Sequence, residues 1–205
     1  MNTISLKKII AIVAIILAMT GLWFGWKNHQ KKPEPKPLPP PKVKKEEMKP
    51  HAPVLIGTYT TLLPASSSRA RTKNIETTIG MINNSVINPG AEFSFNRKIG
   101  AVTEEKGFVY APIYDDNGQV KPGLGGGMCQ VSSTLYNAVL QAGLQVLERH
   151  PHSKPVNYVP AGRDATVYDD KDFRFRNNKN APIRIYGAVR NNKVTVDIYQ
   201  LADAK

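Results

Sequence analysis

A run of glycines leading into one amphipathic helix constrains this chain more than any other feature of its sequence. Residues 123–143 read GLGGGMCQVSSTLYNAVLQAG, so three consecutive glycines precede Cys129, the single cysteine among 205 residues. Beyond it, apolar residues recur at helical spacing, and Gly143 stands where a helix would end. These apolar residues are Val131, Leu135, Ala138, Val139 and Ala142. The pattern predicts that Cys129 lies at or just before a helix N-terminus.

Cys129 is expected to share one turn of this helix with Ser132, Ser133 and Tyr136, away from the apolar stripe. A helix N-terminus presents unpaired N–H groups and about half a positive charge, which favour a thiolate and could stabilise an oxyanion. The preceding glycines would let a substrate backbone approach closely. A lone cysteine is more often a small buried apolar side chain, but the glycine run and the helix start favour a nucleophile.

Residues 1–26 are predicted to form a membrane anchor. Residues 9–26 make an uncharged run of 18 residues between Lys8 and Lys27, which spans roughly 27 Å as a helix, close to the ~30 Å hydrocarbon core. A cleavable signal peptide would have a shorter apolar core and small residues at the cut site. This run instead ends in bulky aromatic residues suited to a membrane interface. We therefore expect an uncleaved single-pass anchor at the cell membrane, with the N-terminus inside and the remainder exported towards the cell wall.

Residues 27–53 are expected to form an extracytoplasmic tether. Residues 27–50 contain eight lysines, three glutamates and seven prolines, and this composition favours an extended path of roughly 70 Å. The lysines and glutamates leave a charge of +5, and two anchor lysines raise it to +7 of the total +12. The high pI is therefore mostly a property of the tether, so no nucleic-acid partner is inferred. A basic tether suits a membrane or an anionic wall, and a merely solvated linker explains the composition equally well.

Residues 54–205 are long enough for one domain. Their pattern predicts an α+β fold in which one principal helix, carrying the cysteine at its N-terminus, packs on a mainly antiparallel sheet. A smaller helix is expected at 72–84, and turns at 88–90 and 116–118. A hairpin is expected at 182–199, turning at Asn191 and Asn192. The other predicted strands cover residues 53–63, 93–95, 107–114, 144–149, 156–159, 165–168 and 173–176.

Thiol chemistry on an acyl group needs a base and a group that orients the base. His150 and His152 follow Cys129 by 21 and 23 positions, across the helix and one short strand, and either could return to it. Asp164 could orient the base, and Arg163 could bind a substrate carboxylate, although these two could also form an ordinary surface ion pair. Two histidines with no further ligand at suitable spacing are a weak metal signal, so no metal or cofactor is expected.

Several blocks of the sequence resemble the VanW family, over about residues 74–199. They are PGAEFSFN at 89–96, GGGMCQVSSTLYN at 125–137, ERHPHS at 148–153, GRDATV at 162–167 and DFRFRN at 172–177. The family was named for an association with glycopeptide resistance, and some members are understood to be L,D-transpeptidases. Members often carry additional N-terminal domains, whereas here an anchor and a tether are expected before the matching region.

The resemblance implies an envelope-facing acyl transferase acting on peptidoglycan stem peptides. Cys129 would attack the carbonyl of the third stem residue, with His150 or His152 as base and Asp164 behind it. An amine from a second stem would complete a 3-3 cross-link, whereas water would make the protein an L,D-carboxypeptidase. A non-catalytic module that binds wall peptides or a glycopeptide is the alternative. The residues expected to contact the peptide are Gly125, Gly126, Gly127, Gln130, Ser132, Ser133, Tyr136 and Arg163.

Overall fold

A computed structural model describes residues 52–114 and 119–202. The predicted membrane anchor, most of the tether and the turn at 116–118 lie outside these residues. Within the described ranges, no helix is both long enough and apolar enough to cross a membrane. The elements in chain order are β1 (Val54–Leu62), α2 (Arg69–Ile82), β2 (Val86–Ile87), β3 (Glu92–Ser94), α3 (Phe95–Ile99), the 3₁₀ turn η1 (Glu104–Lys106), β4 (Tyr110–Tyr114), β5 (Val120–Leu124), α4 (Met128–Gln141), β6 (Gln145–Glu148), β7 (Arg174–Arg176), β8 (Ile183–Arg190) and β9 (Lys193–Gln200).

The largest sheet has four antiparallel strands in the order β1-β9-β8-β2. Its centre is the β8–β9 hairpin, which confirms the hairpin predicted at 182–199. Asn191 and Asn192 both have positive φ, 49° and 59°, as the two central residues of a type I′ turn require. The alternate residues of the two strands that face inward are fully buried: Ile183, Ile185, Val194, Val196 and Ile198.

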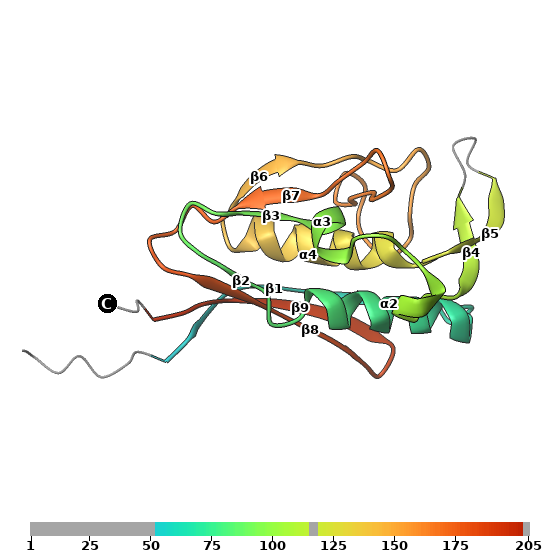
Figure 1. The fold of residues 1–205 in the computed structure, drawn as a ribbon, viewed down its shortest axis with the longest axis horizontal. Coiled ribbons are helices and arrows are strands. Elements are labelled where there is room, and N and C mark those ends of the chain that lie inside the picture. The colour runs from blue at the N-terminus through green and yellow to red at the C-terminus, as the bar shows by residue number, and fades with distance from the viewer. Residues whose placement is uncertain (1–51, 115–118, 203–205) are drawn as a thin grey trace, which may run out of the picture. The chain divides into compact units, whose positions relative to one another are not determined.

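Both long helices pack on one face of this sheet, α4 on β1 and β9, and α2 on β8. Glycines allow the close approach. A Cβ on Gly57 in β1 would overlap the backbone oxygen of Ala138, and a Cβ on Gly187 in β8 would lie 3.0 Å from Ile79. Over the other side of α4 runs a three-stranded antiparallel sheet, β3-β7-β6 (Figure 1). The sheets and helices thus form an α+β fold with α4 in the middle layer.

The structure corrects the expectation of one principal helix, because α2 and α4 each have 14 residues. The start of α2 lies before the predicted residue 72 because Ser68 caps it, accepting a hydrogen bond from the backbone N–H of Arg71 at 3.2 Å. Capping oxygens satisfy N–H groups that a helix start leaves without acceptors. An N-cap serine thus adds a turn that hydrophobic spacing did not predict.

The expected strands at 156–159 and 165–168 are wrong. Residues 156–159 lie in no strand, and residues 165–168 take part only in single bridges, between His150 and Thr166 and between Tyr168 and Lys171. The reason is that the backbone around Ala165 bonds to side chains of α4 rather than to a neighbouring strand. Its N–H donates to Ser133 Oγ at 2.9 Å, and its carbonyl accepts from Ser132 Oγ at 2.6 Å. The segment from residue 149 to 173 is therefore a long connection fastened to the helix.

Candidate active site

Cys129 is the second residue of α4, as the glycine run predicted. The N-cap is Gly127, whose φ of 113° is a conformation that residues with side chains rarely adopt. The N–H of Met128 donates to the carbonyl of Gly125 at 3.1 Å, and that of Gln130 to the carbonyl of Gly127 at 3.0 Å. The amide of Cys129 lies in the first turn, where helix N–H groups lack intrahelical acceptors.

The glycines before Cys129 are required by contacts within the protein. A Cβ on Gly126 would lie 2.6 Å from the backbone oxygen of Pro112, and one on Gly127 would lie 2.9 Å from Ile75. Asn74, fully buried in α2, donates from Nδ2 to the carbonyl of Gly126 at 3.1 Å. The loop is thus held between α2 and β4. These glycines also line the cavity described next, so their expected role towards a peptide stays a prediction.

A cavity of about 1060 Å³ opens at this end of α4. Its wall includes Cys129, His152 and Tyr158, together with Arg71 from α2 and residues of the β4–β5 hairpin. Its volume is at the upper end of the range of ligand pockets, roughly 300–1,000 Å³. The cavity thus brings together side chains from four separate parts of the chain and is large enough for a peptide segment.

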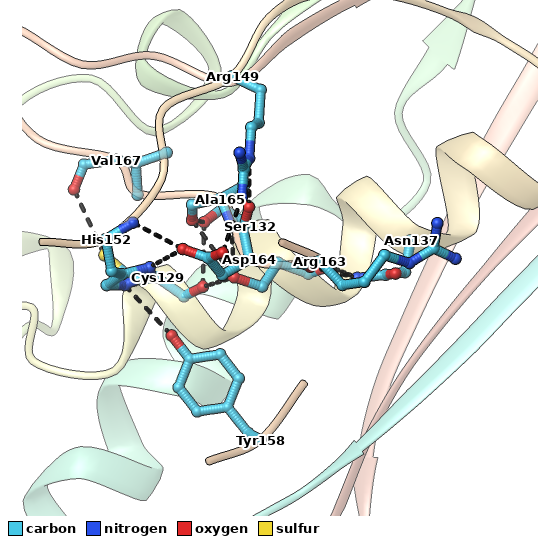
Figure 2. A network of polar contacts seen from close by, with 11 residues as sticks. Cys129, Ser132, Asn137, Arg149, His152, Tyr158, Arg163, Asp164, Ala165 and Val167 are labelled. Carbon is cyan, nitrogen blue, oxygen red and sulfur yellow. Dashed lines mark hydrogen bonds and ion pairs between the residues drawn. The ribbon is translucent and has the colours of Figure 1, made fainter. Parts of the chain in front are cut away.

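His152 is held at the cavity wall by Asp164 (Figure 2). The ring Nδ1 and the backbone N–H of His152 each lie 2.6 Å from Oδ2 of Asp164, and Oδ1 accepts from Arg149 Nη2 at 2.7 Å. Both side chains of the His152–Asp164 pair are nearly buried, at 12% and 11% exposure. Because an ionised carboxylate only accepts, the proton of a neutral His152 ring lies on Nδ1, which leaves Nε2 as the basic nitrogen.

Asp164 is suited to remain ionised. Burial by itself raises its pKa, but the hydrogen bonds from the backbone and ring of His152 outweigh that effect and hold the pKa below its ordinary value. Arg149 adds a second hydrogen bond, from Nε to the backbone carbonyl of Asp164 at 2.6 Å. A permanently charged carboxylate behind an imidazole both orients the ring and stabilises its protonated form.

Tyr158 approaches His152 from the other side. Its hydroxyl lies 3.3 Å from Nε2 of His152 (Figure 2), and the two rings meet edge to face with centroids 6.4 Å apart. Burial raises the pKa of the Tyr158 phenol far above its usual value, so the hydroxyl stays neutral and able to donate. Both ring nitrogens of His152 therefore have a neighbour that sets the orientation of the imidazole.

The thiol of Cys129 is partly buried and donates to the backbone carbonyl of Val167 at 3.5 Å. Burial raises its pKa, although a backbone contact at Val167 and the positive charge of Arg71 act in the opposite direction. The resting side chain is thus a neutral thiol rather than the stable thiolate that the helix N-terminus alone would favour. Any nucleophilic step needs a base to remove the proton as attack occurs.

The structure separates the two candidate histidines. Nε2 of His150 lies 3.0 Å from Oε1 of Glu148 at the end of β6, and its side chain is 37% exposed. Only His152 of the two lies among the residues that line the cavity with Cys129. Within residues 52–114 and 119–202 no three potential ligands gather as a metal site.

The polar face of α4, expected to meet substrate, is mostly buried and fastens the Asp164 segment. Ser133 Oγ accepts from the N–H of Ala165 at 2.9 Å and donates to the carbonyl of Cys129 at 2.7 Å. Asn137 Nδ2 donates to the carbonyl of Arg163 at 2.7 Å. Ser132, as described above, holds the same segment. These side chains act by positioning the residues behind His152.

Three further predicted contact residues bond or pack within the protein or lie away from the cavity. Gln130 belongs to the cavity lining, but its side chain is fully buried, and its Nε2 donates to Thr61 Oγ1 at 3.0 Å and to the carbonyl of Leu62 at 2.9 Å. Tyr136 packs edge-on against Phe173 and lies outside the set that lines the cavity. Arg163 is exposed and also lies outside that set, because the backbone turns outward at residues 160–163 before Asp164 points in.

Residue spacing did not single out Arg71, Tyr158 or Arg149. Arg71 precedes the predicted start of the first helix, so only recognition of the Ser68 cap would have placed it on a helix. Tyr158 lies in the segment 156–159, which was interpreted as a strand and in which nothing pointed to a role for its hydroxyl. Arg149 was part of a family-like block, but no pattern linked it to Asp164.

Comparisons with known proteins agree on one family. Residues 70–199 match the family model described as "VanW like protein". The chain is 42% identical over 160 residues to the "Uncharacterized protein YoaR" of Bacillus subtilis (strain 168), covering 78% of this chain and 52% of that protein. It is 26% identical over 136 residues to the "Vancomycin B-type resistance protein VanW" of Enterococcus faecalis (strain ATCC 700802 / V583), covering 62% of this chain and 48% of that protein. The chain thus spans about half the length of these relatives. No solved structure matches it significantly.

Proposed function

The chain belongs to the VanW family, and from this premise and the geometry around Cys129 we propose that it is a cysteine acyl transferase acting on peptidoglycan stem peptides. The observation that carries the proposal is that Cys129 and His152 line one cavity, while Asp164 holds Nδ1 of His152 at 2.6 Å. Nucleophile, base and orienting carboxylate are the parts that acyl transfer through a covalent intermediate requires.

The first half-reaction forms a thioester. The Tyr158 hydroxyl gives up its contact with Nε2 of His152, and Nε2 then accepts the proton of the Cys129 thiol as the sulfur attacks the carbonyl carbon of the third stem residue. The first-turn amide of Cys129 is suited to stabilise the oxyanion that develops on the former carbonyl oxygen. When the tetrahedral intermediate collapses, His152 passes its proton to the leaving amine of the terminal D-amino acid, and the Cys129 thioester remains.

The second half-reaction releases the enzyme. An amine from a neighbouring stem attacks the thioester, His152 takes up its proton, and the thiolate leaves and is reprotonated. The product is an amide between two third residues, a 3-3 cross-link. Water in place of the amine would give a shortened stem and a free carboxylate, so the acceptor decides between L,D-transpeptidase and L,D-carboxypeptidase activity.

The cell envelope as the site of action is part of the same proposal. The sequence of residues 1–53 suits a single-pass anchor with a long exported tether, which would let a membrane-bound enzyme reach the wall. The name of the E. faecalis relative associates that protein with resistance to vancomycin, which supports a role at the wall.

A second candidate function is a non-catalytic module that binds wall peptides. The observation that favours it is that burial raises the pKa of the Cys129 thiol, since many structural cysteines are neutral and inert for the same reason. The two candidates share one cavity and one ligand class but differ in whether the thiol reacts.

One experiment separates the two candidates. The whole chain and a Cys129→Ala variant, purified in detergent, are incubated with disaccharide-tetrapeptides whose third residue is lysine or diaminopimelate, and products are analysed by mass spectrometry. Dimers or shortened stems formed only by the native protein would establish acyl transfer. If both proteins leave every stem unchanged, the enzyme proposal is refuted and peptide binding becomes the function to measure.

A further inference from the structure

A cation from a separate element lies beside the reactive end of α4. Arg71 belongs to the first turn of α2 and lines the cavity that contains Cys129. Its side-chain stem packs on the N-cap of α4, since a Cβ on Gly127 would come within 3.2 Å of Arg71 Cγ. Because Gly127 precedes Cys129 by only two residues, α2 places this arginine at the turn that carries the thiol.

The cavity has an excess of positive charge. Arg71, Lys121 and Lys171 line it, against a single carboxylate in the same lining set, that of Asp169. Lys121 lies at the exposed rim on β5, and Lys171 is about one-third exposed. The stem of Arg71 packs on the N-cap of α4, so we expect its charge to act strongly on an anion bound at the helix start.

The chemistry of the guanidinium matches one kind of anion. A planar guanidinium has five N–H donors and pairs with a carboxylate through two parallel hydrogen bonds. Arg71 Nη1 also donates to Ser67 Oγ at 3.3 Å, which ties the side chain to the residue before the helix cap. The positive charge of Arg71 opposes the larger effect of burial, which raises the pKa of both Cys129 and Tyr158, so the guanidinium acts on both groups at the reactive centre.

Resting on the acyl transfer proposed above, we propose that Arg71 binds the C-terminal carboxylate of the donor peptide and so selects peptides with one residue beyond the bond that Cys129 attacks. One residue spans at most about 3.6 Å of chain, so the carboxylate of a terminal residue lies close to the bond that Cys129 attacks. Arg71, packed on Gly127 two residues before Cys129, is a lining cation at that end of the cavity. Sequence spacing suggested Arg163 for this role, but its side chain is exposed and outside the cavity lining.

Binding to an inactive protein tests the proposal without any need for turnover. In a Cys129→Ala background, calorimetry measures the dissociation constants of a stem tetrapeptide with a free C-terminal carboxylate and of the same peptide amidated at that end. A third peptide, amidated at its other carboxylates only, distinguishes the chain end from the rest of the stem. Losing a charge-assisted pair costs about tenfold to hundredfold in affinity, so the C-terminal amide alone should bind that much more weakly.

Arg71→Gln should abolish this preference, so that free acid and C-terminal amide bind alike. The matched control is Arg69→Gln, which removes the same charge from an exposed position of the same helix turn and should keep the preference. Because the Cys129→Ala background lacks the thiol, no effect of Arg71 on Cys129 enters the comparison. The proposal is overturned if Arg71→Gln retains the preference, if the native cavity shows none, or if no stem peptide binds.

Turnover separates this proposal from the proposed function. If the preference depends on Arg71 and native protein also forms Cys129-dependent products, tetrapeptides should be used at least tenfold better than pentapeptides, which place their carboxylate one residue too far. If the preference depends on Arg71 but native protein forms no product, the carboxylate site stands and the acyl transferase proposal fails. Equal use of tetrapeptides and pentapeptides by an active native protein would refute Arg71 as the selector while leaving acyl transfer intact.

Discussion

Replacing Asp164 with asparagine is expected to disable the site by changing which ring nitrogen of His152 carries the proton. Oδ1 of the carboxylate accepts from Arg149 at 2.7 Å, and Oδ2 accepts from the backbone and the ring of His152, both at 2.6 Å. Asparagine keeps one acceptor oxygen and presents an NH₂ group in place of the other. Whichever way the amide turns, one of its N–H groups meets a donor.

The expected magnitudes follow from these contacts. If the amide nitrogen faces His152, the ring can accept at Nδ1 only by moving its proton to Nε2. Nε2 could then no longer take the proton of Cys129 as the proposed reaction requires. A wrong tautomer of this kind lowers turnover on the order of 10³- to 10⁴-fold. If the nitrogen faces Arg149, a guanidinium whose side chain is 21% exposed loses its charge partner. Loss of one partner of a fully buried pair costs about 3–5 kcal/mol, so we expect about 2 kcal/mol of unfolding free energy here.

The matched control is Glu148→Gln, the same change of charge behind the other histidine. Glu148 contacts His150 at 3.0 Å and Arg174 at 3.3 Å, outside the cavity lining. Mass-spectrometric rates on tetrapeptides and urea unfolding midpoints are measured for both variants. Only Asp164→Asn should lose turnover while remaining folded. Equal rates in the two variants, or a larger loss in Glu148→Gln, would refute His152 as the base.

Three further predictions concern acidity, the thiol and packing. Because hydrogen bonds hold the pKa of Asp164 below its ordinary value, its stabilising contribution is complete above about pH 4 and is lost as pH falls through the folded-state pKa. The difference in urea midpoint between native protein and Asp164→Asn should therefore shrink from about pH 7 to about pH 3, and a constant difference would contradict this. Because burial raises the pKa of the Cys129 thiol, alkylation by iodoacetamide should rise steeply only above about pH 9, and a plateau reached below about pH 7 would show a stable thiolate instead. Gly57→Ala should lower the unfolding free energy by about 2–3 kcal/mol because its Cβ would overlap the backbone oxygen of Ala138. Gly80→Ala, with open space around it, should raise the unfolding free energy by up to about 1 kcal/mol. Thermal unfolding of both variants measures these changes.

Local patterns predicted the parts of the fold that local interactions determine. The β8–β9 hairpin follows from alternating Ile and Val around two asparagines that tolerate positive φ, and α4 follows from its apolar stripe. The position of Cys129 in the first turn likewise followed from the glycines before it. In each case the residues that determine the local structure are neighbours in the sequence.

The errors concern contacts between distant segments. Residues 165–168 alternate like a strand, yet buried serines on α4 take the hydrogen bonds that a neighbouring strand would have made. Spacing left His150 and His152 equivalent because they differ by only two positions, and Asp164 separates them only once the chain is folded. Arg71 approaches Cys129 from a helix that begins 60 residues earlier in the chain, a relation that no local pattern contains.

The order of strands in the largest sheet also determines when this domain can begin to fold. Among residues 52–114 and 119–202, the first strand, β1, pairs along its whole length with the last, β9, and β2 pairs only with β8. A ribosome that has synthesised the chain as far as α4 has therefore produced two strands whose only partners do not yet exist. Pairing between strands so far apart in the sequence is slow, because the chain loses the entropy of loop closure before the stabilising contacts form. The growing chain would stay open until its final hairpin emerges, which is the state in which a polypeptide can still be threaded through a narrow pore.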